Sequence, residues 1–282
     1  MVSQINASLF QFTTGACTMR FYTLPGLHVS KPAIHVISLQ TAQDRRAFMK
    51  EQLDRLQLSY EFFDAIHGSK QPDHYLFQKY NDKKRASRRG LNATLRLSQL
   101  GCFASHYLLW EKCSKTDTPI IVLEDDAILL PPFMSFYKNM QQFASSHDLV
   151  WLQPSRKVTI QSGRIIGEIG PFTVKKFAKG FAGTTGYMMT PQAANTLLGY
   201  CSEWIYPVDN TMDRFYDHKI EAIGIEPVCV NQEDDFESFI NVAATDNKRT
   251  LRDSLRRELA SLKDNISRTI HNAAFYIKLR TR

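Results

Sequence analysis

The stretch at residues 118–132, TPIIVLEDDAILLPP, limits the possible folds most strongly. Residues 120–123 form a short, uninterrupted and largely β-branched apolar run, which predicts a strand covered on both faces, as in the sheet of an α/β protein. The run ends in three consecutive carboxylates, Glu124, Asp125 and Asp126. Because like charges repel, such an ending to a buried strand calls for an explanation.

One explanation is a metal site. Alternate side chains of an extended chain share a face, so Glu124 and Asp126 are expected to converge while Asp125 turns away. Magnesium or manganese held by one or two carboxylates keeps positions free for substrate phosphates, and open sheets bind ligands outside the carboxyl ends of their strands. The triplet therefore predicts a metal-diphosphate site; the alternative is a solvated acidic turn that caps the next helix.

The chain is basic overall. Its formal net charge is +7 and its pI is about 9.1, so nucleic acid, anionic lipid and phosphorylated substrates are candidate partners. Nucleic acid is unlikely to be the partner on sequence grounds, because no zinc finger or RNP motif is recognisable. A length of 282 residues suits one large domain or two small ones, and a hydrophobic fraction of 43% supplies a sizeable core.

The cysteine pattern and the N-terminus bear on the compartment. The five cysteines include no CxxC pair and no histidine set at zinc spacing, so we expect reduced, structural thiols in a cytoplasmic protein. Residues 1–30 carry one charge, Arg20, and lack a basic region ahead of an apolar block, which argues against a signal peptide. We expect these residues to be an N-terminal tail.

The first elements after this tail predict a right-handed crossover. Residues 34–39 and 60–63 are expected to be strands, with a helix between them. Arg45 and Arg46 fall in the first turn of that helix, where the helix dipole disfavours cations. This placement indicates a phosphate or nucleotide contact, unless the two side chains belong to a solvated face.

The middle of the chain predicts alternating helices and strands. Residues 69–97 are polar and basic and are expected to form a solvated loop. A helix follows over residues 98–112, and His106 on its inner stripe is either a hydrogen-bonded core residue or a ligand. Residues 158–160 and 164–169 flank a Ser-Gly pair, which predicts a β-hairpin.

A second acidic series follows a glycine-rich stretch, a short strand and a helix that Thr190, as N-cap, and Pro191 are expected to begin. Asp209, Asp213 and Asp217 recur every four residues and would share one helical face. Like charges at that spacing repel, so local stability does not explain them. A general base or an anchor for an acceptor hydroxyl would, and a solvated face is the alternative.

Residues 246–282 form a segment of separate character. Apolar residues recur every three or four positions from Leu251 to Ile277, which predicts an amphipathic helix. Between Lys248 and Arg282, ten lysines and arginines stand against three acidic residues, so this segment alone accounts for the net charge of the chain. The pattern suits a helix on an anionic membrane surface. Packing on its own domain and a dimerisation arm are the competing interpretations.

Five blocks of sequence carry a resemblance to a known family. In order they are HVISLQTAQDRR, YEFFDAIHG, LRLSQLGCFASHYLLWEK, IIVLEDDAILL and GTTGYMMTPQAANTLL. Together they resemble the bacterial lipooligosaccharide glycosyltransferases of family 25, which are similar to the procollagen galactosyltransferases. The resemblance covers roughly residues 33–240.

The resemblance implies a GT-A type nucleotide-sugar-binding α/β fold with a mostly parallel central sheet over residues 31–245. It implies inverting transfer of a hexose, galactose favoured, from a UDP-sugar to a lipooligosaccharide or lipopolysaccharide core acceptor, with a β-linkage as in β-1,4-galactosyltransferases. The acceptor is lipid-linked, so we expect a cytoplasmic enzyme, peripheral on the inner face of the bacterial inner membrane and held there by the C-terminal helix.

The resemblance also implies roles for particular residues. Mn²⁺ or Mg²⁺ would be held by Asp126 and Glu124, and the base for the acceptor hydroxyl would be Asp209 or Asp213. The family commonly has an acidic residue at the position of His67. The donor-site candidates are Ser38, Leu39, Arg45, Asp64, His106 and Asp125.

Two other classes of function remain compatible with the sequence. A metal-dependent phosphohydrolase or nuclease would use the acidic triplet to hold metal for attack by water. A non-catalytic protein would bind anionic lipid or nucleic acid through its basic surface, and would depend on residues 248–282 and not on Asp126.

Overall fold

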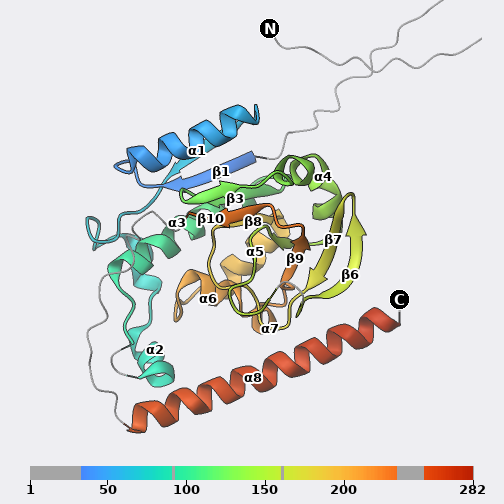
Figure 1. The fold of residues 1–282 in the computed structure, drawn as a ribbon. Coiled ribbons are helices and arrows are strands. Elements are labelled where there is room, and N and C mark those ends of the chain that lie inside the picture. The colour runs from blue at the N-terminus through green and yellow to red at the C-terminus, as the bar shows by residue number, and fades with distance from the viewer. Residues whose placement is uncertain (1–32, 91–92, 160–161, 234–250, 282) are drawn as a thin grey trace, which may run out of the picture. The chain divides into compact units, whose positions relative to one another are not determined.

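The computed structural model describes residues 33–90, 93–159, 162–233 and 251–281. The N-terminal tail expected over residues 1–30 lies outside the described residues. The described chain forms an α/β fold with helices on both faces of a central sheet (Figure 1).

The central sheet has eight strands. In spatial order they are β2 (Tyr60–Asp64), β1 (Ala33–Ser38), β3 (Ile120–Glu124), β8 (Gly186–Met189), β5 (Leu149–Trp151), β9 (Ile223–Glu226), β7 (Phe172–Lys176) and β6 (Arg164–Ile169). β1 runs parallel to both β2 and β3, and β5 runs parallel to β9, but the other four pairings are antiparallel. The sheet is therefore mixed: six strands run in one direction, in line with the mostly parallel sheet that the resemblance implied, and β7 and β8 run in the other. β8 enters in the opposite direction because a hairpin, and not a crossover helix, precedes it.

Two helical layers enclose the sheet. One face is covered by α1 (Gln43–Arg55) and α4 (Phe133–Ser146), and the other by α3 (Leu97–Ser114) and α5 (Pro191–Tyr200). α5 begins as its sequence predicts, because the Thr190 side chain accepts a hydrogen bond from the backbone N–H of Ala193 at 3.1 Å.

β3 shows why the apolar run at residues 120–123 lacks alternation. Ile120 and Val122 belong to the core under α3 and α5, and Ile121 and Leu123 to the core under α1 and α4. All four are at most 2% exposed. The prediction of a strand covered on both faces is confirmed.

The β-hairpin predicted around residues 162–163 is wrong. β6 pairs with β7, and the chain turns at Gly170, which has a φ of +55°. Val158 and Thr159 lie in irregular chain ahead of β6. The turn sequence Gly170-Pro171 carries the signal, because glycine adopts a positive φ without a steric penalty.

The solvated loop predicted over residues 69–97 is also wrong in part. This stretch contains a 3₁₀ helix, η1 (Tyr75–Lys79), and α2 (Asp82–Arg89). Leu76 and Leu95 are 2% and 4% exposed and pack into the core beside α3. A few apolar side chains therefore fix a stretch whose composition is polar.

The second acidic series is divided between two short helices, α6 (Val208–Met212) and α7 (Phe215–His218). Asp213 is the C-terminal cap of α6 and Asp217 lies in α7, so the three aspartates do not share one helical face. Their four-residue spacing misled the prediction, because the helix breaks at Asp213 and Arg214.

Two elements complete the fold. A two-stranded ribbon joins β4 (Ala127–Leu129) to β10 (Val230–Gln232), directly after the acidic triplet. The C-terminal segment forms α8 (Leu251–Arg280), a helix of 30 residues. None of the helices in the described part of the chain combines the length and the apolar character that crossing a bilayer requires.

Candidate active site

A pocket opens where the parallel strands β1 and β3 end, as expected for an open α/β sheet. Its volume is about 200 Å³. The walls are the ends of these two strands, the loop after β2 and the first half of α3. The lining residues are Ile37, Ser38, Leu39, Arg45, Ala65, Ile66, His67, Gly68, Ser69, Ser98, Cys102, Ser105, Glu124, Asp125 and Asp126.

The acidic triplet lies at this pocket, although not in the extended form that the sequence suggested. β3 ends at Glu124, and Asp125 and Asp126 form a turn before β4. All three carboxylates line the pocket. The prediction that Asp125 turns away is therefore wrong, because the turn ends the alternation of a strand.

Asp125 is fixed by two of the predicted donor-site residues. Ser38 Oγ donates to Asp125 Oδ2 at 2.7 Å, and Arg45 Nη1 donates to Asp125 Oδ1 at 3.0 Å. The Arg45 and Asp125 side chains are each 12% exposed. This arrangement places a guanidinium at the pocket wall, where an anionic ligand group would approach.

The neighbouring arginine has a different role. Arg46 Nε donates to the carbonyl of Leu39 at 3.1 Å, Arg46 Nη2 donates to the carbonyl of Ser38 at 3.0 Å, and the same Nη2 pairs with Asp64. Gln40 Nε2 also donates to Asp64, at 2.7 Å. Asp64 is absent from the pocket lining, so it holds the chain after β1 and β2 in place from outside.

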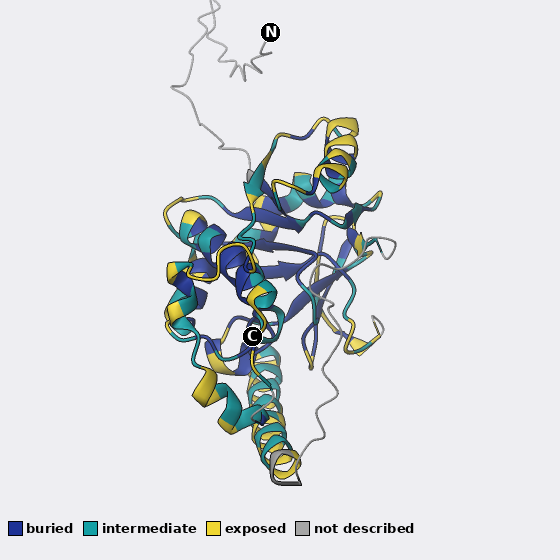
Figure 2. Cartoon of the chain, turned by 90° about the vertical axis from the view of Figure 1, so that its left-hand side faces the viewer, coloured by how far each residue is buried: buried dark blue, intermediate teal, exposed yellow. Residues whose placement is uncertain are grey.

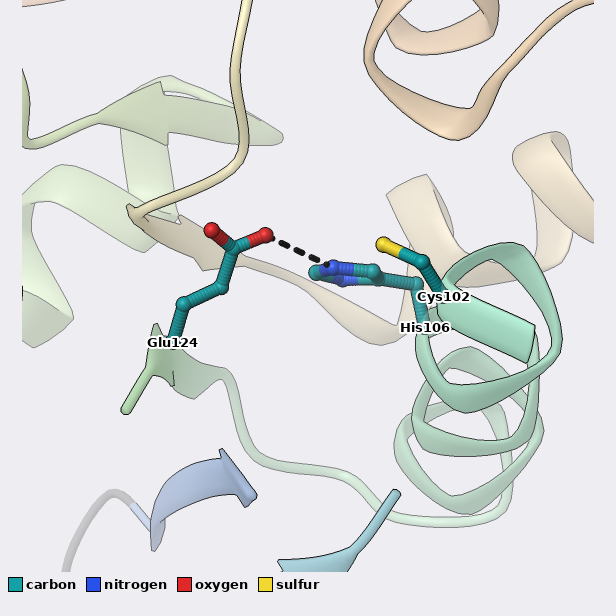
Figure 3. A group of neighbouring side chains, drawn as sticks. All are labelled: Cys102, His106 and Glu124. Atoms are coloured by element: carbon teal, nitrogen blue, oxygen red, sulfur yellow. Dashed lines mark hydrogen bonds and ion pairs between the residues drawn. The ribbon is translucent and has the colours of Figure 1, made fainter. Parts of the chain in front are cut away.

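Glu124 is held by hydrogen bonds from two sides. Thr184 Oγ1 donates to Glu124 Oε1, and His106 Nε2 lies 3.4 Å from the same oxygen. In Figure 3 the other carboxylate oxygen points away from the imidazole. Burial raises the pKa of Glu124, but the hydrogen bonds from His106 and from the Thr184 hydroxyl outweigh this effect, so the pKa is lowered and the group is ionised.

His106 does not line the pocket; it is fully buried behind Glu124. His106 Nδ1 lies 2.9 Å from the Tyr187 hydroxyl, to which Trp110 Nε1 donates at 3.0 Å. The indole can only donate and the Glu124 carboxylate can only accept, so all three groups are satisfied when the hydroxyl accepts from Trp110 and donates to His106 Nδ1. In a neutral imidazole the remaining hydrogen is then on Nε2 and is donated to Glu124. The residue predicted to bind donor therefore orients a carboxylate.

Asp126 is the least satisfied of the three carboxylates. Gln232 Nε2 donates to Asp126 Oδ2 at 2.9 Å, but within the described residues Oδ1 is buried and has no hydrogen-bond partner. Burial and the charges of Glu124 and Asp125 raise the pKa of Asp126 to about 7. A buried oxygen without a donor, beside two further carboxylates, is a site that a cation would stabilise.

The donor set fits the expected Mn²⁺ or Mg²⁺. These hard cations prefer carboxylate oxygens, and Asp126 Oδ1 offers one to which no group of the described chain donates. A second set of ligand atoms lies deeper. Cys102, one helical turn before His106, brings its sulfur to a group in which the thiol, imidazole and Glu124 ligand atoms all lie within 4.8 Å of one another (Figure 3). Burial, followed by the charge of Glu124, raises the pKa of the Cys102 thiol well above its usual range. The thiolate, which is the form that ligates a metal, is therefore disfavoured here.

The pocket wall formed by α3 was missed by sequence reasoning. A Cβ on Gly101 would lie 2.4 Å from the carbonyl oxygen of Ile66, and one on Gly68 would lie 1.7 Å from that of Leu97, so the helix and the loop touch backbone to backbone. Ser105 Oγ accepts from the N–H of Ile66 at 2.9 Å. The two glycines were the available signal, since close backbone approach requires them.

The two candidate bases lie in different environments. Asp213 is 4% exposed and fully engaged: its carboxylate accepts from Lys157 Nζ at 2.7 Å and from the backbone N–H groups of Phe181 and Ala182 at 2.7 and 2.8 Å. Asp209 is half-buried at the start of α6, and its charge contributes to the raised pKa of Cys102, after burial and Glu124. Asp209 is not among the residues that line the pocket, and Asp213 organises the glycine-rich stretch.

One protein family matches the chain over most of its length. Residues 31–212 match the model of glycosyltransferase family 25, described as an LPS biosynthesis protein. The chain belongs to glycosyltransferase family 25. The matched range includes β1, the acidic triplet, α3 and Asp209, so the family assignment covers the whole pocket.

Individual family 25 relatives are similar at modest identity. The lipooligosaccharide biosynthesis protein lic2B of Haemophilus influenzae is 26% identical over 70% of this chain and 75% of its own length. A putative glycosyltransferase of H. influenzae is 23% identical over 86% of this chain and 92% of its own length. Procollagen galactosyltransferase 1-B of Xenopus laevis is 22% identical over 70% of this chain but only 35% of its own length.

Proposed function

We propose that this family 25 member is an inverting, metal-dependent glycosyltransferase that moves a hexose from a UDP-sugar to a lipooligosaccharide or lipopolysaccharide core acceptor. The observation that carries the proposal is Asp126 Oδ1, a buried carboxylate oxygen without a partner among the described residues, in a pocket where two parallel strands end. The name of lic2B supports the acceptor class, and the name of the procollagen galactosyltransferase supports galactose as the hexose. We propose a GT-A type fold as the scaffold, since the pocket lies where parallel strands of an α/β sheet end.

The proposed donor site uses the groups around the triplet. Asp126 and Glu124 would hold Mn²⁺ or Mg²⁺, which supplies Lewis-acid stabilisation of the charge that develops on the diphosphate. Arg45 lies beside this position and complements an anionic donor. The His106 and Thr184 contacts keep Glu124 ionised and oriented before the donor arrives.

The proposed acceptor site lies toward α6. An acceptor hydroxyl is a poor nucleophile and needs a positioned base. We assign this role to Asp209, because Asp213 already accepts three hydrogen bonds from its own chain. Attack by the acceptor oxygen on the face of the anomeric carbon opposite the diphosphate would invert its configuration, so an α-linked donor would give a β-linked product.

Calorimetry with a panel of nucleotide sugars tests this function. UDP-galactose, UDP-glucose and UDP-N-acetylglucosamine are titrated in manganese and again in EDTA, with the native chain and with Asp126→Asn. Asp217→Asn is the matched control, since that carboxylate lies outside the pocket lining. We expect metal-dependent binding of one UDP-sugar, lost in Asp126→Asn and kept in the control.

Product analysis completes the test. Transfer to a core oligosaccharide should give a β-anomer by NMR, with UDP released in equal amount. Release of free hexose at the same rate with and without acceptor would instead identify a hydrolase. Folded protein that binds no nucleotide sugar would refute the proposal.

A further inference from the structure

α8 has one face that is docked on the rest of the described chain. Asp264 accepts two hydrogen bonds from Arg214, from Nη1 at 2.9 Å and from Nη2 at 2.7 Å. His271 Nε2 lies 2.8 Å from Glu221 Oε1, and Asn272 donates to the carbonyl of Ala178 at 3.2 Å. The helix therefore runs along α2 and α7 (Figure 1), held by this charged fork and by the rings of Phe275 and Tyr276, which lie against Lys176 and Arg164.

The opposite face of α8 carries its apolar stripe into solvent. The stripe consists of six large aliphatic side chains at spacings of three, four or seven, each between 52% and 66% exposed: Leu255, Leu259, Leu262, Ile266, Ile270 and Ile277. Elsewhere in the described chain, only Tyr75, Leu97 and Ile165 are large hydrophobic residues of comparable exposure. Exposed apolar surface is thus concentrated on one face of α8. Figure 2 shows this helix alternating between intermediate and exposed residues along its length.

The charges around the stripe indicate what covers it. Lys263 lies one helical turn from both Leu259 and Ile266, and Arg280 lies one turn from Ile277; both cations are exposed. Glu258 is the exposed acid among the described side chains of α8. The basic helix α2 packs against α8 and brings further lysines and arginines near it.

We propose that this stripe docks on an anionic lipid bilayer, with its aliphatic side chains at the level of the acyl boundary and its cations at the headgroups. A second copy of the chain is the less suitable occupant, because it would bring another segment of net charge +7 against this one. An anionic surface instead complements that charge.

The docked face makes this surface different from a tail that folds when it meets lipid. α8 is already helical and is tied to α7 through Arg214, so lipid binding would fix the orientation of the whole described chain. This orientation would help to deliver a lipid-linked acceptor to the pocket, and that use rests on the proposed function. The binding itself does not.

Vesicle sedimentation with the full chain tests the surface. We compare vesicles of phosphatidylglycerol and phosphatidylcholine with vesicles of phosphatidylcholine alone. The test variant is Leu259→Asn with Ile266→Asn, and the matched control is Ile165→Asn, an equally exposed isoleucine on β6. We expect binding to the anionic vesicles only, weakened about 100-fold in the double variant, because each buried aliphatic side chain contributes about one order of magnitude. The control should bind as the native chain does.

Three results would overturn the inference. They are native, folded chain that does not sediment with anionic vesicles, a double variant that binds as well as the control, and a dimer by light scattering that the double variant dissociates. Turnover of a soluble acceptor separates the two proposals: the double variant should keep it, whereas failure of the native chain to transfer sugar would count against the transferase alone.

Discussion

Asp126 and Asp213 are both carboxylates that the sequence marked as site residues, but Asp213 is buried whereas Asp126 is half-buried with one buried oxygen, and their surroundings differ. Three donors surround the Asp213 carboxylate, at 2.7 to 2.8 Å, and the nearby Gly180 is a residue at which a Cβ would lie 2.2 Å from Oδ1. Asp126 has one side-chain donor, Gln232, and one buried oxygen without a partner in the described chain. Its nearest charged neighbours include two more carboxylates.

Asp213 is therefore a structural acid, whereas Asp126 leaves a position open for a ligand. The chain around Asp213 has folded to satisfy it, so little remains for a substrate. The chain around Asp126 leaves a cost of burial and repulsion that a cation would remove. The two regions are also joined, because the stretch that begins at the Asp213-bound backbone continues to Thr184, which bonds Glu124.

Replacing Asp126 should give the largest effect. For Asp126→Asn we expect kcat/KM for transfer to fall on the order of 10³-fold, because a metal contributes several kcal/mol of charge stabilisation in the transition state. The free energy of unfolding should stay the same or rise, since the variant removes a buried charge that repels Glu124 and Asp125. Activity assays and urea unfolding measure the two quantities. Lost stability together with full activity would reverse the comparison.

Replacing Asp213 should lower stability more than it lowers activity. Asp213→Ala leaves the partly buried ammonium of Lys157 and two backbone N–H groups without their acceptor, so we expect the free energy of unfolding to fall by about 3 kcal/mol. Urea unfolding, monitored by circular dichroism, measures it. Lys157→Met is the control, and should cost less because the two backbone groups keep their acceptor. A stable Asp213→Ala variant without turnover would make Asp213 the base instead of Asp209.

The region around Asp213 should also respond to pH. Burial lowers the pKa of His218 to about 4, and its ring bonds the carbonyl of Met212 at 3.0 Å and the N–H of Ile220 at 3.2 Å. Because the unfolded chain binds the proton at higher pH, stability is full above about pH 6.5 and is lost as the pH falls toward 4, by about 3 kcal/mol. Urea unfolding between pH 7 and pH 4 measures the loss. In His218→Gln the free energy of unfolding should fall less between pH 7 and pH 4 than in the native chain. A remaining fall is expected in the variant, because burial also lowers the pKa of His35 to about 4.

The sequence predicted those parts of the fold whose pattern is local. The run at residues 120–123 predicted a doubly covered strand, and Thr190 predicted the start of α5, because burial and capping leave marks on neighbouring residues. The order of strands was missed, since β8 pairs with strands far from it in the chain. The hairpin partner of β6 was missed for another reason, because the sequence pattern indicated a turn at the Ser-Gly pair in place of Gly170-Pro171. The mixed sheet depends on such pairings, which no local pattern encodes.

The candidate site shows the same limit. Strand position marked Glu124, Asp125 and Asp126, and the first helical turn marked Arg45, whereas Ser38 came only from the family resemblance. What could not be predicted is which polar group faces which. The polar partners of Glu124 come from α3 and from the stretch before β8, and the imidazole that was a candidate ligand lies behind the carboxylate. Hydrogen-bond partners at such sequence separations are set by packing alone.

The smallest expected effect concerns the hydrogen bonds that hold Glu124. Tyr187→Phe removes the hydroxyl between Trp110 and His106, so the imidazole loses the bond that fixes its tautomer and orientation. We expect the affinity for Mn²⁺ in the presence of UDP to weaken about tenfold, the range typical of groups that orient a ligand, with a loss of stability of about 1–2 kcal/mol from the stranded indole N–H. Calorimetry gives the affinity. Tyr137→Phe, on α4 across the sheet, is the matched control and should leave the affinity unchanged. A purely structural hydroxyl would lower stability in Tyr187→Phe without moving the manganese affinity, and that outcome would detach His106 from the metal site and leave Thr184 as the group that orients Glu124.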